Sequence, residues 1–236
     1  MKLPLAILSG GLGTRMRPLT NDLPKAMLEI CGEPFVHWQI TLLAKSGIEK
    51  IVYCSGFKSE IIENYLEDGS RYGIKIEYSH DGPEPLGTAG ALKKAIPKLG
   101  EQFMVLYGDS FLPIDYRAIE KAFKLSKKPA LMTVYFNEGK YVESNVKFSH
   151  GEILKYSKLH NDKDMKYVDY GINCFKSELF SHSKNLVPMD LSEINRGLVE
   201  NKQLAGLEVF SRFYEVGSFK GIADFTQYIE SWKDVI

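Results

Sequence analysis

The sequence lacks the charge imbalance and the long apolar runs that mark several large classes of protein. Its 30 basic and 30 acidic residues give a formal net charge of +0. Nucleic acids and anionic membranes select basic proteins, so neither is an expected partner. No stretch reaches the roughly 18 apolar residues of a membrane-spanning helix. The apolar run near the N-terminus is short and ends in glycines, unlike a signal peptide. We therefore expect a soluble, cytoplasmic protein.

Disulfide and metal-binding patterns are also missing. The 3 cysteines lie far apart in apolar surroundings and match neither a zinc spacing nor a disulfide framework. We expect them to be buried free thiols in a reducing compartment. The 5 histidines share no motif and no metal spacing. A histidine metal centre or a His/Cys nucleophile is therefore not expected.

The patterns that are present indicate an α/β protein. With 236 residues, 44% of them hydrophobic, the chain fits one large domain. Apolar runs alternate with helical segments, which predicts right-handed βαβ units. The predicted fold class is a Rossmann-like, three-layer α/β/α arrangement with a mostly parallel mixed sheet. We expect strands over 3–8, 26–30, 51–55, 74–78, 103–107, 129–136, 168–175 and 204–210, a hairpin over 148–155, and helices over 34–46, 59–66, 86–96, 115–125, 190–199 and 222–232.

A loop rich in glycine and basic residues follows the first predicted strand. It reads Ser9-Gly10-Gly11-Leu12-Gly13-Thr14-Arg15-Met16-Arg17-Pro18-Leu19-Thr20, and Leu23-Pro24-Lys25 comes soon after. The glycines allow a tight turn whose backbone N–H groups can surround an anion. Arginine and lysine side chains beside such a turn bind phosphate oxygens. These features favour a triphosphate cradle, and an ordinary glycine-rich turn with solvated basic residues is the alternative.

This loop matches neither of two common phosphate-binding motifs. No Gly-Lys-Ser/Thr follows the glycines, as a Walker A loop requires, and the G-x-G-x-x-G spacing is missing. The loop does resemble the signature of the sugar-1-phosphate nucleotidyltransferases, Gly-Gly-x-Gly-Thr-Arg-Leu-x-Pro-x-Thr followed by Pro-Lys, with Met16 in place of the leucine. The resemblance implies that Arg15 and Lys25 are catalytic, and that the nucleotide is bound by Leu8, Ser9, Gly10, Gly11, Gly13 and Thr14.

The resemblance also has consequences for the whole chain. It implies a glycosyltransferase-A-like nucleotidyltransferase fold in a single domain, residues 1–236. The nucleotide would bind to a half spanning about 1–112, and the sugar phosphate to a half spanning about 113–236. Relatives often form dimers or tetramers, so a homo-oligomer is among the expected assemblies.

Two more motifs lie in the first half. Residues 86–91, Leu-Gly-Thr-Ala-Gly-Ala, open a predicted helix with small side chains, which let a flat ligand approach the backbone or a helix pack closely. The resemblance implies contacts of Leu86, Gly87 and Thr88 with the base and ribose. Asp109 follows the apolar run 103–107, and ligands of open α/β sheets bind where such strands end. A turn-capping Asp is the alternative, and the resemblance implies a magnesium ligand and catalytic residue.

The second half departs from the family pattern in several places. Lys158 matches the lysine of a Glu-Lys-Pro element, although Ser157 and Leu159 replace its neighbours. Lys158 is therefore expected at the sugar phosphate, with a surface lysine as the alternative. A strand predicted over 168–175 contains a glycine, often a sign of close ligand approach. Family position and this pattern assign substrate contacts to Asp169, Gly171 and Asn173. Glu215 stands where the family has a second aspartate ligand to magnesium.

The predicted reaction joins a nucleoside triphosphate to a sugar 1-phosphate and releases pyrophosphate, with Mg²⁺ as cofactor. The resemblance to short mannose- and heptose-1-phosphate guanylyltransferases favours GTP. Such enzymes supply nucleotide sugars for cell-surface polysaccharides. One alternative is a cytidylyltransferase for a non-sugar phosphate such as phosphocholine, for which an aromatic cage could be built from Tyr141, Tyr156, Tyr167 and Tyr170. The other is a non-catalytic, nucleotide-binding regulatory subunit.

Overall fold

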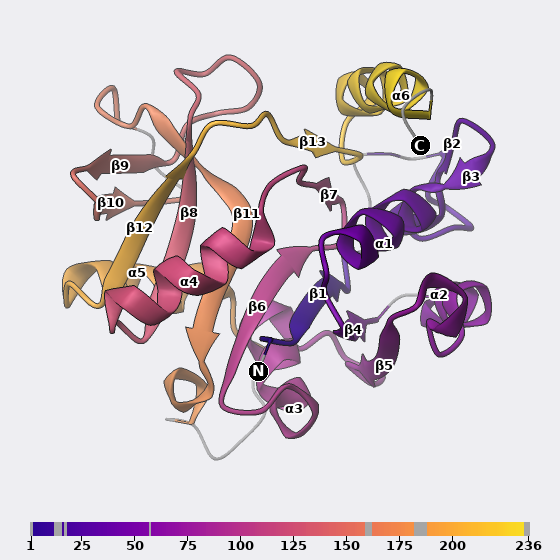
Figure 1. Cartoon of the computed structure of the whole chain (residues 1–236), viewed down its shortest axis with the longest axis horizontal. Helices are drawn as coiled ribbons and strands as arrows, with labels where there is room; N and C mark the ends of the chain where they lie inside the picture. Colours follow the sequence, from indigo (N-terminus) through magenta and orange to yellow (C-terminus); the bar gives the residue numbers. More distant parts are fainter. Residues whose placement is uncertain are drawn as a thin grey trace.

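A computed structural model describes residues 2–11, 16, 18–56, 58–158, 162–181 and 188–233. Their central feature is a nine-stranded mixed sheet (Figure 1). Its strands are β1 (Leu5–Ser9), β4 (Lys50–Ser55), β5 (Lys75–His80), β6 (Gln102–Tyr107), β8 (Ala130–Phe136), β9 (Val146–Ser149), β10 (Glu152–Tyr156), β11 (Tyr167–Lys176) and β12 (Leu204–Val209). They lie in the order β5-β4-β1-β6-β11-β8-β12-β10-β9.

The first four strands of this order are all parallel. They are connected through α1 (Phe35–Lys45), α2 (Ser59–Leu66) and α3 (Gly87–Leu99). The residues of β1, β4 and β6 are almost entirely buried, as expected for strands covered on both faces, whereas β5 at the edge is only partly buried. Because the strands run in one direction, the residues that follow β1, β4, β5 and β6 all lie at the same edge of the sheet.

The second half adds antiparallel pairs. β11 runs antiparallel to both β6 and β8, while β12 is parallel to β8. The predicted hairpin is formed by β9 and β10, whose turn residues His150 and Gly151 have φ values of 49° and 79°. Two residues with positive φ are typical of a tight hairpin turn. The helices of this half that pack on the main sheet are α4 (Tyr116–Ser126) and α5 (Leu191–Glu200).

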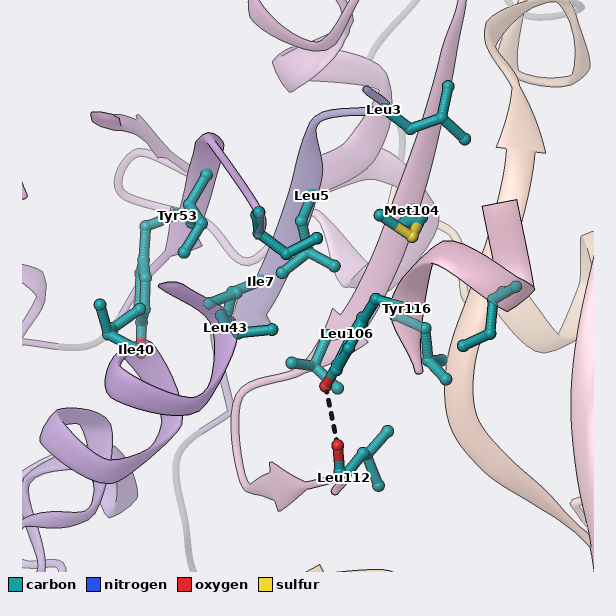
Figure 2. Packing of buried hydrophobic residues seen from close by; sticks show 14 of the residues in the cluster. Leu3, Leu5, Ile7, Ile40, Leu43, Tyr53, Met104, Leu106, Leu112 and Tyr116 are labelled. Carbon is teal, nitrogen blue, oxygen red and sulfur yellow. Dashed lines mark hydrogen bonds between the residues drawn. The ribbon is translucent and has the colours of Figure 1, made fainter. Parts of the chain in front are cut away.

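Helices cover both faces of the sheet, which confirms the three-layer arrangement. On one face, α1, α2 and α4 pack on a large apolar cluster. Figure 2 shows its centre, where Leu5 and Ile7 of β1 lie beneath α1, and the Tyr116 hydroxyl donates a hydrogen bond to the Leu112 carbonyl, 3.1 Å away. On the other face, α3 and α5 pack on a second cluster.

A third cluster lies outside the main sheet and is built on α6 (Phe219–Lys233). Phe225 of this helix contacts Phe111 and Phe35, with ring centroids 4.8 Å and 5.2 Å apart. The cluster supports two small two-stranded sheets. One pairs β2 (Glu29–Ile30) with β3 (Glu33–Pro34), and the other pairs β7 (Ser110–Phe111) with β13 (Tyr214–Glu215).

The predicted α/β fold with a mixed sheet is confirmed, with local corrections. The strand expected over 26–30 is wrong in its first half, where Lys25–Met27 form the 3₁₀ helix η2. The Pro24 carbonyl accepts a hydrogen bond from the Met27 N–H at 2.8 Å, which closes the turn. The helix expected to end at 96 continues through Pro97 to Leu99, and its last turn is closed by the Gly100 N–H, which donates to the Ile96 carbonyl at 2.8 Å. Two further 3₁₀ helices, η3 (Ser70–Tyr72) and η4 (Ser177–Phe180), were not predicted.

The helices that the structure describes include none that is both long and apolar enough to span a membrane. The prediction of buried cysteines is confirmed for two of the three. Cys54 and Cys174 are buried free thiols, while Cys31 is half-buried.

Candidate active site

A cavity of about 310 Å³ opens at the edge of the sheet where β1, β4, β5 and β6 end. Many residues predicted from sequence line it together, namely Leu8, Ser9, Gly10, Gly11, Lys25, Gly87, Thr88 and Asp109. Other lining residues were not predicted to be functional, and these include Cys54, Asp81, Tyr107 and Asp190. Gly13, Thr14 and Arg15 lie outside the described residues.

Asp109 is held by a tight turn at the end of β6. The Gly108 N–H donates to the Leu8 carbonyl at 2.8 Å, and a Cβ on Gly108 would lie 2.8 Å from the Ser9 Cβ. Position 108 therefore requires glycine. From α1, the Gln39 amide donates to the carbonyls of Tyr107 and Ser110 at 3.3 Å and 2.7 Å. The turn is thus fixed from two sides, and the Asp109 carboxylate faces the cavity.

Lys25 lies directly beside Asp109. Its ammonium is 3.1 Å from Asp109 Oδ2, and only 16% of the Lys25 side chain is exposed. Lys25 is the first residue of η2, so the 3₁₀ turn that replaces the predicted strand determines its direction. A sheltered ammonium next to a carboxylate can bridge to a phosphate, since it has three N–H donors.

Glu215 joins this pair from the far end of the chain. β13 pairs with β7, placing Glu215 opposite Ser110, and the Val216 N–H donates to the Asp109 carbonyl at 3.0 Å. A Cβ placed on Gly217 would lie 2.9 Å from Glu215 Oε2, 3.3 Å from Asp109 Oδ2 and 3.5 Å from Lys25 Nζ. Two carboxylates and one ammonium therefore face a single point.

This donor set fits a hard divalent cation. Mg²⁺ in phosphate-transfer sites is held by one or two carboxylates together with phosphate oxygens. Glu215 also accepts hydrogen bonds from the Gly217 N–H and the Ser218 hydroxyl, and Gly221 lies against it. A carboxylate has about four lone-pair sites, so these bonds leave acceptor capacity for a metal.

The cavity lining also includes Asp81, which follows β5 and is separated from β6 by two strands of the sheet. Its Oδ2 accepts a hydrogen bond from the Leu86 N–H at 3.4 Å. A Cβ on Gly10 would lie 3.2 Å from the same oxygen. Burial raises the pKa of the Asp81 carboxyl. Nearby, burial raises the pKa of Cys54 to about 12, so this residue lines the cavity as a neutral thiol.

The start of α3 is packed against the segment that precedes α5. The Met189 N–H donates to the Leu86 carbonyl at 3.0 Å, and the Ala89 N–H donates to the Met189 carbonyl at 2.9 Å. Gly87 has a φ of +71°, and a Cβ there would lie 2.5 Å from the Met189 oxygen. Close packing therefore accounts for this glycine. Leu86 is buried and contributes backbone contacts, while Gly87 and Thr88 reach the cavity.

Lys158 lies near the cavity wall. Its ammonium is 3.4 Å from Asp190 Oδ1 and 5.7 Å from the centroid of the Tyr107 ring. Both of these partners line the cavity. The sequence had marked Asp190 as a helix start, and its carboxylate does cap α5, accepting the Ser192 N–H at 2.8 Å. The structure adds that this cap belongs to the cavity.

The three predicted residues of β11 form a small polar group of their own. Asp169 Oδ1 accepts hydrogen bonds from the Gly171 N–H at 3.2 Å and the Asn173 amide at 3.3 Å. Burial raises the pKa of the Asp169 carboxyl. Gly171 has a φ of +104°, at an irregularity in the pairing with β8, and a Cβ there would meet no atom closer than 3.5 Å. Its backbone conformation therefore calls for glycine. The group lies behind Tyr107 and is not part of the cavity lining.

The four tyrosines proposed for a choline cage are divided among different sites. Tyr141 and Tyr170 both contact Phe213, and the Arg212 guanidinium lies 4.3 Å from the Tyr141 ring. Tyr167 packs instead between Phe136 and Phe148. Tyr156 is buried in the cluster under α5. These rings do not converge on one cavity among the described residues.

Comparison with known proteins places the chain in a family. A family model described as nucleotidyl transferase matches residues 5–235. The chain belongs to this family. Among curated relatives, it is 43% identical over 116 residues to N-acetylmuramate alpha-1-phosphate uridylyltransferase of Neisseria meningitidis serogroup B, covering 48% of this chain and 49% of the relative. It is 45% identical over 113 residues to D-glycero-alpha-D-manno-heptose 1-phosphate guanylyltransferase of Aneurinibacillus thermoaerophilus, covering 47% and 48%.

Both matches span about half the length of these curated relatives. Among solved structures, this nucleotidyl transferase resembles a Bacillus anthracis protein, provisionally designated a glucose-1-phosphate thymidylyltransferase and crystallised with a sucrose. The TM-score is 0.85 at 20% identity, and the match covers 96% of this chain and 95% of that one. The likeness shows that the fold is shared by this family over nearly the whole chain.

Proposed function

We propose that this chain condenses a nucleoside triphosphate with a sugar 1-phosphate, forming a nucleoside diphosphate sugar and pyrophosphate. The observation that carries this proposal is that Lys25 and Asp109, which line the cavity together with Gly10 and Gly11, meet Glu215 beside Gly217. Membership of the nucleotidyl transferase family supports the reaction class. The two curated relatives described above are named for transfers to sugar 1-phosphates, which supports the acceptor class.

The residues have separate tasks in this reaction. The backbone at Ser9, Gly10 and Gly11 receives the phosphates of the nucleotide, with Gly13, Thr14 and Arg15 continuing the loop. Lys25 neutralises the α-phosphate and the incoming phosphate, so that the two anions can approach. The acceptor oxygen attacks the α-phosphorus in line and pyrophosphate leaves. The acceptor phosphate is already ionised near neutral pH, so the residues need not supply a general base.

Asp109 and Glu215 would hold Mg²⁺. When bound there, the ion would supply positive charge that offsets the charge developing on the phosphate oxygens. The Lys25 ammonium, paired with Asp109, reduces the repulsion between the Asp109 and Glu215 carboxylates before Mg²⁺ binds. At the acceptor end, we assign Lys158, beside the cavity wall, to the sugar phosphate. We assign Asp169, Gly171 and Asn173, which lie behind Tyr107 and outside the cavity lining, to the sugar side of the site.

The Asp81 carboxylate favours guanine as the base. It follows β5, which β4 and β1 separate from β6 and Asp109, and it lies next to Leu86 and Gly87 at the start of α3. The guanine edge presents adjacent N1–H and amino donors, whereas the single N–H of uracil lies between two carbonyl oxygens. A carboxylate only accepts hydrogen bonds, so it matches the guanine edge and repels the uracil carbonyls. We therefore propose GTP with a mannose- or heptose-type sugar phosphate.

A matrix of substrates tests this function. Pyrophosphate release is measured with Mg²⁺ for GTP, UTP, CTP and ATP, each with the 1-phosphates of mannose, heptose, glucose and N-acetylglucosamine and with phosphocholine. The proposal expects turnover with GTP and a mannose or heptose phosphate. Turnover with phosphocholine and CTP alone would replace it by the cytidylyltransferase alternative. Nucleotide binding without turnover of any pair would favour a non-catalytic role.

A further inference from the structure

Asp190 joins two parts of the cavity that are far apart in sequence. Its carboxylate lines the cavity and caps α5, with Oδ1 accepting the Ser192 N–H at 2.8 Å. The reaction described above requires no carboxylate at this end, because the acceptor arrives as an anion. The negative charge of Asp190 is therefore not explained by the reaction, and a helix cap does not require it, because asparagine caps as well as aspartate.

Thr88 fixes one side of the Asp190 carboxylate. The Thr88 hydroxyl donates to Asp190 Oδ2 at 3.3 Å and accepts the Leu191 N–H at 2.7 Å. The neighbouring backbone is also tied down, since Met189 exchanges hydrogen bonds with Leu86 and Ala89. The carboxylate therefore has a defined place relative to the start of α3, which lies on the nucleotide side of the cavity.

Lys158 meets the other side of the same carboxylate. Its ammonium is 3.4 Å from Asp190 Oδ1, and its side chain is 38% exposed. Burial raises the pKa of Asp190, but hydrogen bonds from Ser192 and the charge of Lys158 outweigh burial, so this pKa lies below its ordinary value. Asp190 is thus ionised and attracts the ammonium. The Tyr107 ring, 5.7 Å away, offers a second, weaker attraction.

We propose that Asp190 is a positioning residue that holds the Lys158 ammonium at the acceptor end of the cavity. This inference rests on the proposed function, in which Lys158 meets the acceptor phosphate. Lysine has a long, flexible side chain, and ordering it on binding costs free energy. One N–H directed to Asp190 leaves two for the phosphate. The acceptor therefore meets a cation that is already in place.

A second effect of Asp190 opposes the ordering of Lys158, and we expect it to be weaker. The Asp190 carboxylate also repels the acceptor phosphate, so its removal could favour binding. Its charge is already balanced by Lys158 and by the positive end of the α5 dipole. The loss of ordering is therefore expected to dominate. Because the Lys158–Asp190 pair is partly exposed, its contribution to binding of the acceptor is modest.

Substitution of Asp190 by asparagine removes the negative charge and keeps the helix cap. Asparagine caps helices about as well as aspartate, and it retains an oxygen that can accept from Thr88. We expect Asp190→Asn to raise the KM for the sugar phosphate about threefold to fivefold, with the KM for the nucleotide and the melting temperature unchanged. Lys158→Met should raise the acceptor KM at least as much. The double variant should match Lys158→Met, because both changes remove one interaction.

Asp115→Asn is the matched control. Asp115 caps α4 by accepting the N–H groups of Arg117 and Ala118, and it is not part of the cavity lining. Its acceptor KM should equal that of the unmodified chain. Turnover with an unchanged or lowered acceptor KM in Asp190→Asn, or additive effects in the double variant, would overturn the inference alone. Absence of turnover in the unmodified chain would instead overturn the proposed function and the inference together.

Discussion

Lys25, Asp109 and Glu215 come from three distant stretches of chain, and their charged groups face the same point beside Gly217. Each was predicted from sequence because it follows a recognisable pattern. The pattern could not give their mutual arrangement, which depends on the pairing of β7 with β13 and on the turn at η2. Asp81 was missed, although it follows a strand just as Asp109 does, because its strand alternates only weakly.

Asp81→Asn should change the choice of base. An amide can donate as well as accept, so it no longer repels the carbonyls of uracil. We expect the ratio of kcat/KM for GTP to that for UTP to fall about tenfold, the equivalent of roughly 1.4 kcal/mol. Pyrophosphate release under matched conditions measures this ratio. An unchanged ratio, with both nucleotides turned over, would show that Asp81 does not read the base.

The same substitution should have a pH-dependent effect on stability. The pKa of Asp81 is raised above its ordinary 3.8 by burial, so folding favours its protonated form. The charge therefore costs stability above the raised pKa, and the cost disappears as the pH falls below 3.8. Asp81→Asn should gain stability over the unmodified chain at neutral pH but not at low pH. Urea denaturation of both proteins at several pH values measures this gain. A gain in stability at low pH but not at neutral pH would contradict the assignment.

At the scale of elements, the approach of α3 to the segment before α5 depends on Gly87. Its φ of +71° is unfavourable for other residues, and a Cβ would lie 2.5 Å from the Met189 carbonyl. Gly87→Ala should lower the free energy of unfolding by more than about 2 kcal/mol. Gly139→Ala is the control, because φ is +75° there but no atom lies within 4 Å. Its expected loss is about 1 kcal/mol. Equal losses would show that the Met189 contact carries no cost.

The small sheet of β7 and β13 depends on α6 for support. Phe225 is fully buried against Phe111, next to the strand that carries Glu215. Phe225→Leu should destabilise the fold by about 1 to 2 kcal/mol and raise the Mg²⁺ concentration for half-maximal activity by about fivefold. Phe123→Leu is the control, since Phe123 of α4 is also buried but belongs to another cluster. The Phe123→Leu variant should lose stability but keep its Mg²⁺ dependence. An equal shift of the half-maximal Mg²⁺ concentration in both variants would contradict the special role of α6.

Across the whole molecule, the sequence allowed the parallel half to be predicted well. Strands β1, β4, β5 and β6 are separated by clear helical periods, so their parallel βαβ units could be predicted. The return of the chain from β5 to the far side of β1, where β6 lies, could not. The place of β11 could not be predicted in this way. It is antiparallel and lies between β6 and β8, a position determined by packing between distant segments of the chain. That insertion places Gly171 behind Tyr107, and the hydrogen bonds between Met189 and α3 hold Asp190, with Lys158 beside it, next to the start of α3.

In the proposed reaction, a nucleotidyl group is transferred to a sugar phosphate at Lys25, Asp109 and Glu215. The most direct measurement is the amount of pyrophosphate and of nucleotide sugar formed from GTP and mannose or heptose 1-phosphate, in the unmodified chain and in Asp109→Asn. We predict equal amounts of the two products, with turnover reduced at least about a hundredfold in the variant. Pyrophosphate without a nucleotide sugar, or full activity in Asp109→Asn, would contradict the claim.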